Sequence, residues 1–335
     1  MKRLTFMIAV CVFLLSVKNE LFAQDISASA QNGKIARGVN IIGYDDALWK
    51  DHTKGRFKEA YFKKIKEAGF SSIRVNLFPF SHMDKNFRIN EAWLKTLDWV
   101  VKNGLEAKLM VILDMHEYNA MADDPVAKKE MFLSVWRQLA PRYKDQPDQV
   151  VFELLNEPNQ KLSVALWNTY LVEAINLVRQ TNPNRTLIIG PGNWNGIESL
   201  PTLVLPKDDK NIIVTVHFYH PMPFTHQGAW WSKENKDLSG IQWTGTEAEK
   251  ADVITKLKVA ADWSKASDRP IFLGEFGAYD KADMESRARY TAFVARTAEK
   301  FGFSWAYWQF DSDFIVYDIG KETWIKPILN ALMEK

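Results

Sequence analysis

The sequence has almost no cysteine, and its one cysteine, Cys11, lies close to the N-terminus. We predict that residues 1–24 are a signal peptide, because a basic start is followed by an apolar run from Met7 to Val17. Residues 25–335 would then form no disulfide. A chain of about 300 residues buries a core large enough to fold without one, even in an oxidising compartment. We therefore expect an exported bacterial protein, either periplasmic or secreted.

An excess of charge of either sign is also missing. The formal net charge of +2 arises within the predicted signal peptide, so residues 25–335 carry 40 basic and 40 acidic side chains. A nucleic-acid-binding protein would need a basic face, so we expect no nucleic-acid partner and an uncharged substrate. The apolar run of the signal peptide is too short for a membrane span. We expect no membrane contact after its removal.

Markers of other architectures are absent as well. No nucleotide-binding glycine fingerprint follows the first strand-like run, and no Ser/Gly linker or low-complexity tract divides the chain. Strand-like and helix-like runs alternate instead, which is typical of βα units and a parallel sheet. We predict an α/β fold, a single (β/α)8 TIM barrel over residues 25–335. The predicted strands are 38–42, 72–77, 108–113, 150–155, 186–189, 212–218, 271–274 and 304–308.

Helices are predicted between and after these strands. Their ranges are 56–68, 91–103, 125–142, 162–181, 246–263, 284–300 and 323–333. Gly69, Gly104 and Gly302 follow three of them, where glycine commonly ends a helix. The connection 190–210 is irregular and rich in proline, so its helix is left open. The segment 221–246 is predicted to be an extended loop over the carboxyl-terminal face of the barrel.

Polar side chains follow the apolar part of most predicted strands. In a barrel the carboxyl ends of all strands converge on one face, whatever their separation in sequence. Two glutamates stand out, Glu157 and Glu275, because a carboxylate beside a buried strand is costly unless it is paired or does chemistry. The other polar or aromatic residues at these ends are Asn40, Arg74, Asn76, Asp114, His116, Asn156, His217, Tyr219 and Trp308.

These residues carry a resemblance to glycoside hydrolase family 5, which covers essentially all of residues 25–335. The motifs are Asn156-Glu157-Pro158, His217-x-Tyr219 and Gly274-Glu275-Phe276-Gly277. The resemblance implies a retaining β-glycosidase that acts on a polysaccharide and needs neither cofactor nor metal. The shared active-site positions of the family correspond to Arg74, His116, Asn156, Glu157, His217, Tyr219, Glu275 and Trp308.

Acetal chemistry supports the same assignment. Hydrolysis needs a proton for the leaving oxygen and an anion at the anomeric centre, so the two carboxyls must differ in ionisation and lie about 5 Å apart. Glu157 suits the acid/base, and its neighbour Asn156 is placed to hold the sugar 2-hydroxyl. Glu275 suits the nucleophile, with Arg74 and Tyr219 as donors that favour its charged form.

Further contacts to the substrate are predicted from imidazole and aromatic side chains. The histidines would support the carboxyls, and flat indole rings would pack against pyranose rings. Asn40 lies at the end of the first strand and is included on that ground. The predicted substrate-binding residues besides those above are His116, His217, Trp308, Asn40, Trp194 and Trp231.

The substrate is predicted less sharply than the mechanism. Residues 218–229 resemble cellulase branches of the family, including some that also cut mannan, so we predict an endo-β-1,4-glucanase that acts as a monomer. Several endoglucanase relatives have His-His-Tyr where this chain has His116-Glu117-Tyr118, and Glu117 would alter a subsite. Mannan, xyloglucan and mixed-linkage glucan therefore stay open as substrates.

Two alternatives come from other classes of protein. A catalytically silent carbohydrate-binding barrel is disfavoured, because Glu157 and Glu275 are both present with their supporting residues. A metal-dependent barrel hydrolase could use His116 with Asp114 and Glu117 as ligands. It is disfavoured because no His-x-His pair stands at a strand end.

Overall fold

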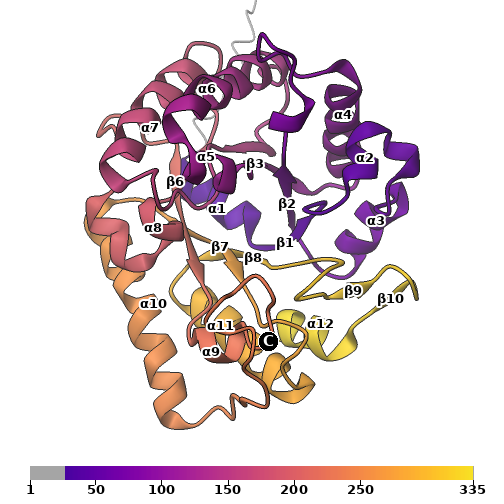
Figure 1. Ribbon diagram of the computed structural model, residues 1–335. Helices are drawn as coiled ribbons and strands as arrows, with labels where there is room; N and C mark the ends of the chain where they lie inside the picture. The colour runs from indigo at the N-terminus through magenta and orange to yellow at the C-terminus, as the bar shows by residue number, and fades with distance from the viewer. Residues whose placement is uncertain (1–26, 335) are drawn as a thin grey trace, which may run out of the picture.

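The structure, a computed structural model, describes residues 27–334, so the predicted signal peptide lies outside the described residues. Within this range eight parallel strands close into one barrel, and the outer helices surround it (Figure 1). The predicted single-domain (β/α)8 barrel is confirmed. The strands are β1 Arg37–Ile41, β2 Ser72–Leu77, β3 Met110–Met115, β4 Val150–Glu153, β5 Leu187–Ile189, β6 Ile212–Phe218, β7 Ile271–Phe276 and β8 Ser304–Tyr307.

The strand ends differ from the prediction in ways that matter for the polar face. β7 continues two residues beyond the prediction, so Glu275 is a strand residue. β4 ends at Glu153, so Asn156 and Glu157 lie in the loop that follows. The pairing of β6 with β7 shifts register between Val216 and His217, which places His217 directly beside Glu275. This irregularity brings two of the predicted site residues together.

The long helices follow the predicted order. They are α3 Glu59–Glu67, α4 Glu91–Glu106, α6 Pro125–Arg142, α7 Val164–Arg179, α10 Glu247–Ser267, α11 Met284–Lys300 and α12 Lys326–Met333. The last begins later than predicted, because β10 Thr323–Trp324 pairs with β9 Tyr317–Asp318 as a small hairpin. Shorter helices are α1 Ala28–Ile35, α2 Asp46–Lys50, α5 Tyr118–Asp123, α8 Gly192–Asn195 and α9 Met222–Thr225. The connection left open after β5 holds α8 and a 3-10 turn, Ile197–Thr202.

One of the three predicted helix-ending glycines has another role. Gly69 and Gly302 follow α3 and α11 with φ of +105° and +77°, as expected for helix ends. Gly104 lies inside α4, so that prediction is wrong. A Cβ on Gly104 would stand 2.7 Å from Cγ2 of Val111. Glycine there allows α4 to pack closely against β3.

The barrel interior is apolar at the amino-terminal ends of the strands and polar at the carboxyl ends. Inward side chains at the apolar end form one buried cluster with α1, namely Ala28, Ile35, Met110, Ile112, Val151, Ile188, Ile213, Phe272 and Ala306. α1 lies inside the ring of outer helices (Figure 1). Two residues farther along β3 and β4 the inward positions are Asp114 and Glu153, both fully buried. The fold thus closes one end with hydrocarbon and leaves polar groups at the other.

The segment 221–246 is largely irregular, as predicted, and contains α9. Its Trp243 is buried against Tyr290 and Phe293 of α11. Trp231 is partly exposed and packs edge-on against Tyr279. None of the helices in residues 27–334 is both long enough and apolar enough to span a membrane.

Candidate active site

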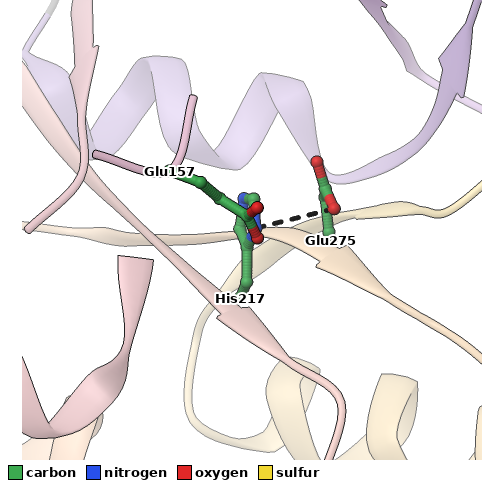
Figure 2. A group of neighbouring side chains, drawn as sticks. All are labelled: Glu157, His217 and Glu275. Carbon is green, nitrogen blue, oxygen red and sulfur yellow. Dashed lines mark hydrogen bonds and ion pairs between the residues drawn. The ribbon is translucent and has the colours of Figure 1, made fainter. Parts of the chain in front are cut away.

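Glu157 and Glu275 meet at the polar end of the barrel. One carboxylate oxygen of each, together with a ring nitrogen of His217, lie within 4.8 Å of one another. Figure 2 shows these side chains converging from three segments: Glu157 from the loop after β4, His217 from strand β6 and Glu275 from strand β7. Glu157 has a left-handed φ of +42°, which is uncommon for a residue other than glycine, and strained backbone of this kind is enriched at functional sites. The separation suits two carboxyls that act on one bond with retention.

His217 connects the two glutamates. Its Nδ1 lies 2.6 Å from Oε1 of Glu157 and 3.5 Å from Oε2 of Glu275. Burial lowers the pKa of His217 to about 4, so its ring is neutral at neutral pH. Burial likewise raises the pKa of Glu157 to about 7. Glu157 therefore keeps a proton far above the pH at which an exposed glutamate loses it.

Glu275 is held by two donors. Nη1 of Arg74 donates to its Oε1 at 2.8 Å, and the hydroxyl of Tyr219 donates to its Oε2 at 2.8 Å. Each carboxylate oxygen therefore has a fixed direction relative to Glu157. The structure brings Arg74 and Tyr219 to Glu275 as the sequence predicted.

Arg74 also pairs with carboxylates below the site. Its Nε and Nη2 donate to the two oxygens of Glu153 at 2.7 and 2.8 Å, and Nη2 lies 3.2 Å from Oδ2 of Asp114. The guanidinium is fully buried. It faces three carboxylates, those of Glu153, Asp114 and Glu275. Sequence reasoning passed over Glu153. A charged residue inside the apolar run of a barrel strand, two positions after the inward Val151, was the available signal.

Replacing Arg74 with alanine is expected to destabilise the fold and to slow the reaction. Three buried carboxylates would lose their cation, and breaking a buried ion pair from one side costs about 3–5 kcal/mol of unfolding free energy. Denaturant unfolding and kcat should be measured together. Arg142→Ala is the control, because Arg142 pairs with Asp98 at the surface and such a pair contributes about 1 kcal/mol or less. An Arg74→Ala variant as stable as the Arg142→Ala variant would contradict this account.

Asn40 is placed beneath the site and does not face its opening. Its side chain is fully buried, with Oδ1 accepting from Arg74 at 2.8 Å and Nδ2 donating to the carbonyl oxygen of Gly274 at 3.0 Å. Full burial argues against the predicted direct substrate contact for Asn40, and for Arg74 as well. Both residues position Glu275 from below.

His116 lies next to both Asn156 and Trp308. Nδ1 of His116 lies 2.5 Å from Oδ2 of Asp114, and its Nε2 lies 3.4 Å from Nδ2 of Asn156. The rings of His116 and Trp308 are parallel, with centroids 5.5 Å apart and an interplanar angle of 8°. Oδ1 of Asn156 accepts from Nη2 of Arg74 at 2.7 Å. These predicted residues form one connected group with the carboxyl pair.

The two predicted exposed tryptophans adjoin the loops that hold the catalytic candidates. Trp194 is 47% exposed, and its backbone N–H donates to the carbonyl oxygen of Pro158, next to Glu157. Trp231 is 41% exposed and lies near His226, whose ring packs edge-on against Tyr219. Both rings are available to a ligand from solvent.

Glu117 is turned away from the carboxyl pair. Its Oε1 accepts the backbone N–H of Phe80 at 2.6 Å, which joins the loop after β3 to the loop after β2. Burial raises the pKa of Glu117 to about 7. This geometry does not add Glu117 to a metal site with His116 and Asp114. Among residues 27–334 the group able to hold a metal ion is Glu157, His217 and Glu275.

Comparisons with known proteins give a consistent result. The family model described as cellulase, glycosyl hydrolase family 5, matches residues 30–313. Endoglucanase C of Acetivibrio thermocellus is 27% identical, with 89% of this chain and 98% of that protein aligned. Endoglucanase H of the same organism is 28% identical over 89% of this chain. The chain aligns with only 33% of the length of Endoglucanase H.

Solved structures extend the comparison to the fold. The endoglucanase Cel5A of Thermotoga maritima is 40% identical, with a TM-score of 0.86, and covers 92% of this chain and 100% of its own. Structures of that enzyme have been solved with cellobiose and with mannotriose.

Proposed function

The chain belongs to glycosyl hydrolase family 5, the cellulase family, and from this premise we propose that it is a retaining endo-β-1,4-glucanase. The observation that carries the proposal is the carboxyl pair within 4.8 Å, in which burial raises the pKa of Glu157 to about 7 while Arg74 and Tyr219 donate to Glu275. One carboxyl suits proton donation and the other suits attack. The substrate is a polysaccharide.

Each glutamate has a defined part in the proposed double displacement. In the first step Glu157 gives its proton to the glycosidic oxygen while Glu275 bonds to the anomeric carbon and the leaving sugar departs. In the second step Glu157, now ionised, takes a proton from water, which attacks the anomeric carbon and releases Glu275. Asn156 and His116 are proposed to bind sugar hydroxyls, and Trp308, Trp194 and Trp231 to pack against pyranose rings.

The pH dependence should follow the proton on Glu157. The acid form is the active one, and it is present below a pKa of about 7 and lost above it. We expect kcat/KM on a soluble β-glucan to fall about tenfold for each pH unit well above this value. A pH profile of kcat/KM, with melts to exclude unfolding, is the measurement. A value still undiminished about two units higher would show that Glu157 is not the acid.

Substrate choice within the family is the finer part of the proposal. Glucan is favoured by the endoglucanase relatives, and mannan is kept as an alternative because Thermotoga maritima Cel5A has been solved with mannotriose. Xyloglucan and mixed-linkage glucan are further alternatives, because their hydrolysis would follow the same mechanism. Product analysis on soluble glucans, mannan and xyloglucan decides between them. Glucan cleavage into mixed oligosaccharides is expected, whereas cleavage of mannan alone would overturn the glucanase proposal, and binding without cleavage would favour a silent carbohydrate-binding barrel.

Metal removal is expected to leave the activity unchanged. Glu157, His217 and Glu275 could coordinate an ion, but Nδ1 of His217 already lies 2.6 Å from Glu157 and 3.5 Å from Glu275, and the proposed steps use the three residues as acid, support and nucleophile. Activity should be measured after dialysis against EDTA, and again with added zinc or manganese. Loss in EDTA that a metal restores would favour the metal-dependent hydrolase instead.

We also propose that the protein is exported and acts as a monomer. Export rests on the apolar segment within residues 1–24. N-terminal sequencing of the protein recovered from a bacterial culture, and its mass in solution, test the two statements.

A further inference from the structure

The roles of the glutamates depend on which ring nitrogen of His217 carries the hydrogen. A neutral imidazole has one N–H donor and one acceptor nitrogen. Nδ1 of His217 lies 2.6 Å from Oε1 of Glu157, and Nε2 lies 3.3 Å from Nδ2 of Asn195. The two tautomers therefore imply two different arrangements of the proton on Glu157.

Only one tautomer leaves the acid proton free for the substrate. If Nε2 carried the hydrogen, Nδ1 would be an acceptor, and the short contact would direct the proton of Glu157 toward His217. If Nδ1 carries the hydrogen, it donates to Oε1, and the acid proton resides on Oε2. The second arrangement is the one that lets Glu157 protonate a leaving oxygen, and this step rests on the proposed function.

We propose that Asn195 is a positioning residue that holds His217 in its Nδ1–H tautomer and so places the acid proton on Oε2 of Glu157. With its amide nitrogen turned toward Nε2, at 3.3 Å, Asn195 acts as a donor, and a donor pairs with Nε2 only when Nε2 is unprotonated. Asn195 is fully buried, and its Oδ1 has no hydrogen-bonding partner among the described residues. Its contact with His217 is therefore the polar interaction that explains a buried amide here.

The surrounding backbone is shaped to deliver this amide. Asn193, Trp194 and Asn195 have left-handed φ values of +56°, +57° and +53°, a succession that side chains rarely adopt. A Cβ on Gly190 would stand 1.9 Å from Oδ1 of Asn195, and one on Gly274 would stand 3.1 Å from Nε2 of His217. The turn and both glycines therefore make room for the amide and the imidazole.

The first test measures the tautomer directly. Nitrogen-15 NMR of the full-length wild-type protein, with His217 assigned through a His217→Gln variant, should show Nδ1 protonated and Nε2 unprotonated at neutral pH. Asn195→Gly is compatible with the left-handed backbone, because glycine adopts positive φ without steric cost, but it deletes the amide. Mixed protonation of the two nitrogens is expected in that variant. A hydrogen on Nε2 in the wild type would overturn the proposal.

The second test separates positioning from packing by the leaving group. Asn195→Gly should lower kcat/KM about threefold to tenfold on an aryl glycoside with a poor leaving group, the loss typical of one hydrogen bond. It should have little effect with a good leaving group, which needs little protonation. Asn193 lies in the same turn, and its amide donates to the hydroxyl of Ser199. Asn193→Gly should leave kcat/KM unchanged with both the poor and the good leaving group. Equal losses with both leaving groups would mean that Asn195 only fills space.

An independent variant covers the possibility that Asn195→Gly fails to fold. In Gly190→Ala the three nearest atoms to the new Cβ all belong to the Asn195 side chain, so the amide must move off His217. The same dependence on the leaving group is expected. If Glu157→Ala itself showed no dependence on the leaving group, the proposed function would fail. If Glu157→Ala behaves as an acid variant but the wild-type Nε2 is protonated, only the role of Asn195 fails.

Discussion

Replacing Glu275 with alanine should abolish hydrolysis of every substrate, activated or not. Without its carboxylate no covalent intermediate can form, and removal of a nucleophile in other covalent enzymes costs about 10⁶-fold in kcat. The variant also removes the acceptor of the Tyr219 hydroxyl and one of the two acceptors of Nη1 of Arg74, which keeps Oδ1 of Asn40. The measurement is kcat on an aryl glycoside and on soluble glucan.

The control for this variant is an exposed glutamate of the same barrel. Glu285→Ala, in the first turn of α11, changes a side chain that is 89% exposed, so full activity is expected. Thermal melts of both variants separate loss of chemistry from loss of fold. Substantial hydrolysis by a folded Glu275→Ala variant would remove Glu275 from the mechanism.

Replacing Glu157 with alanine should have an effect that depends on the substrate. An unactivated glucan needs the proton, and general acid/base catalysis is worth about 10²- to 10⁴-fold, so its hydrolysis should fall by at least that factor. An aryl glycoside with a good leaving group should still form the covalent intermediate. Hydrolysis of that intermediate should be slow, because the general base that activates water is missing. A burst of phenol followed by a slow steady rate is expected.

Azide distinguishes the two glutamates in these variants. It is a nucleophile that needs no general base, so it should accelerate the steady rate of Glu157→Ala by attacking the intermediate on Glu275. In Glu275→Ala no covalent intermediate forms, so azide has no intermediate to attack. Azide rescue of Glu275→Ala with none of Glu157→Ala would mean that the two roles are reversed.

The barrel and the site were predictable from the sequence to the extent that they depend on local pattern. Apolar runs with polar ends mark the strands, and the convergence of strand ends in a barrel predicts that Glu157 and Glu275 meet, as they do in the structure. The donors to Glu275 followed from the same convergence. These features need only the alternation of strands and helices.

Features that depend on close packing or unusual backbone were missed. Gly104 was predicted to end a helix, but it lies inside α4. A glycine is needed there because the helix packs closely against Val111 of β3. Asn195 gave no signal, since its left-handed turn and its contact with His217 exist only in the folded chain. Glu153 was hidden in an apolar run because its partner, Arg74, comes from another strand. The position of Asn40 at a strand end gave no sign that its side chain is fully buried.

The stereochemistry of the first-formed product tests the central claim most directly. Two inversions, one at Glu275 and one by water that Glu157 activates, must leave the anomeric configuration of the substrate unchanged. Proton NMR of a β-glucan digest, recorded before the new reducing ends mutarotate, reads that configuration. The account predicts an initial β-anomer that later equilibrates. An initial α-anomer would show single-displacement inversion and would contradict the assignment of both glutamates.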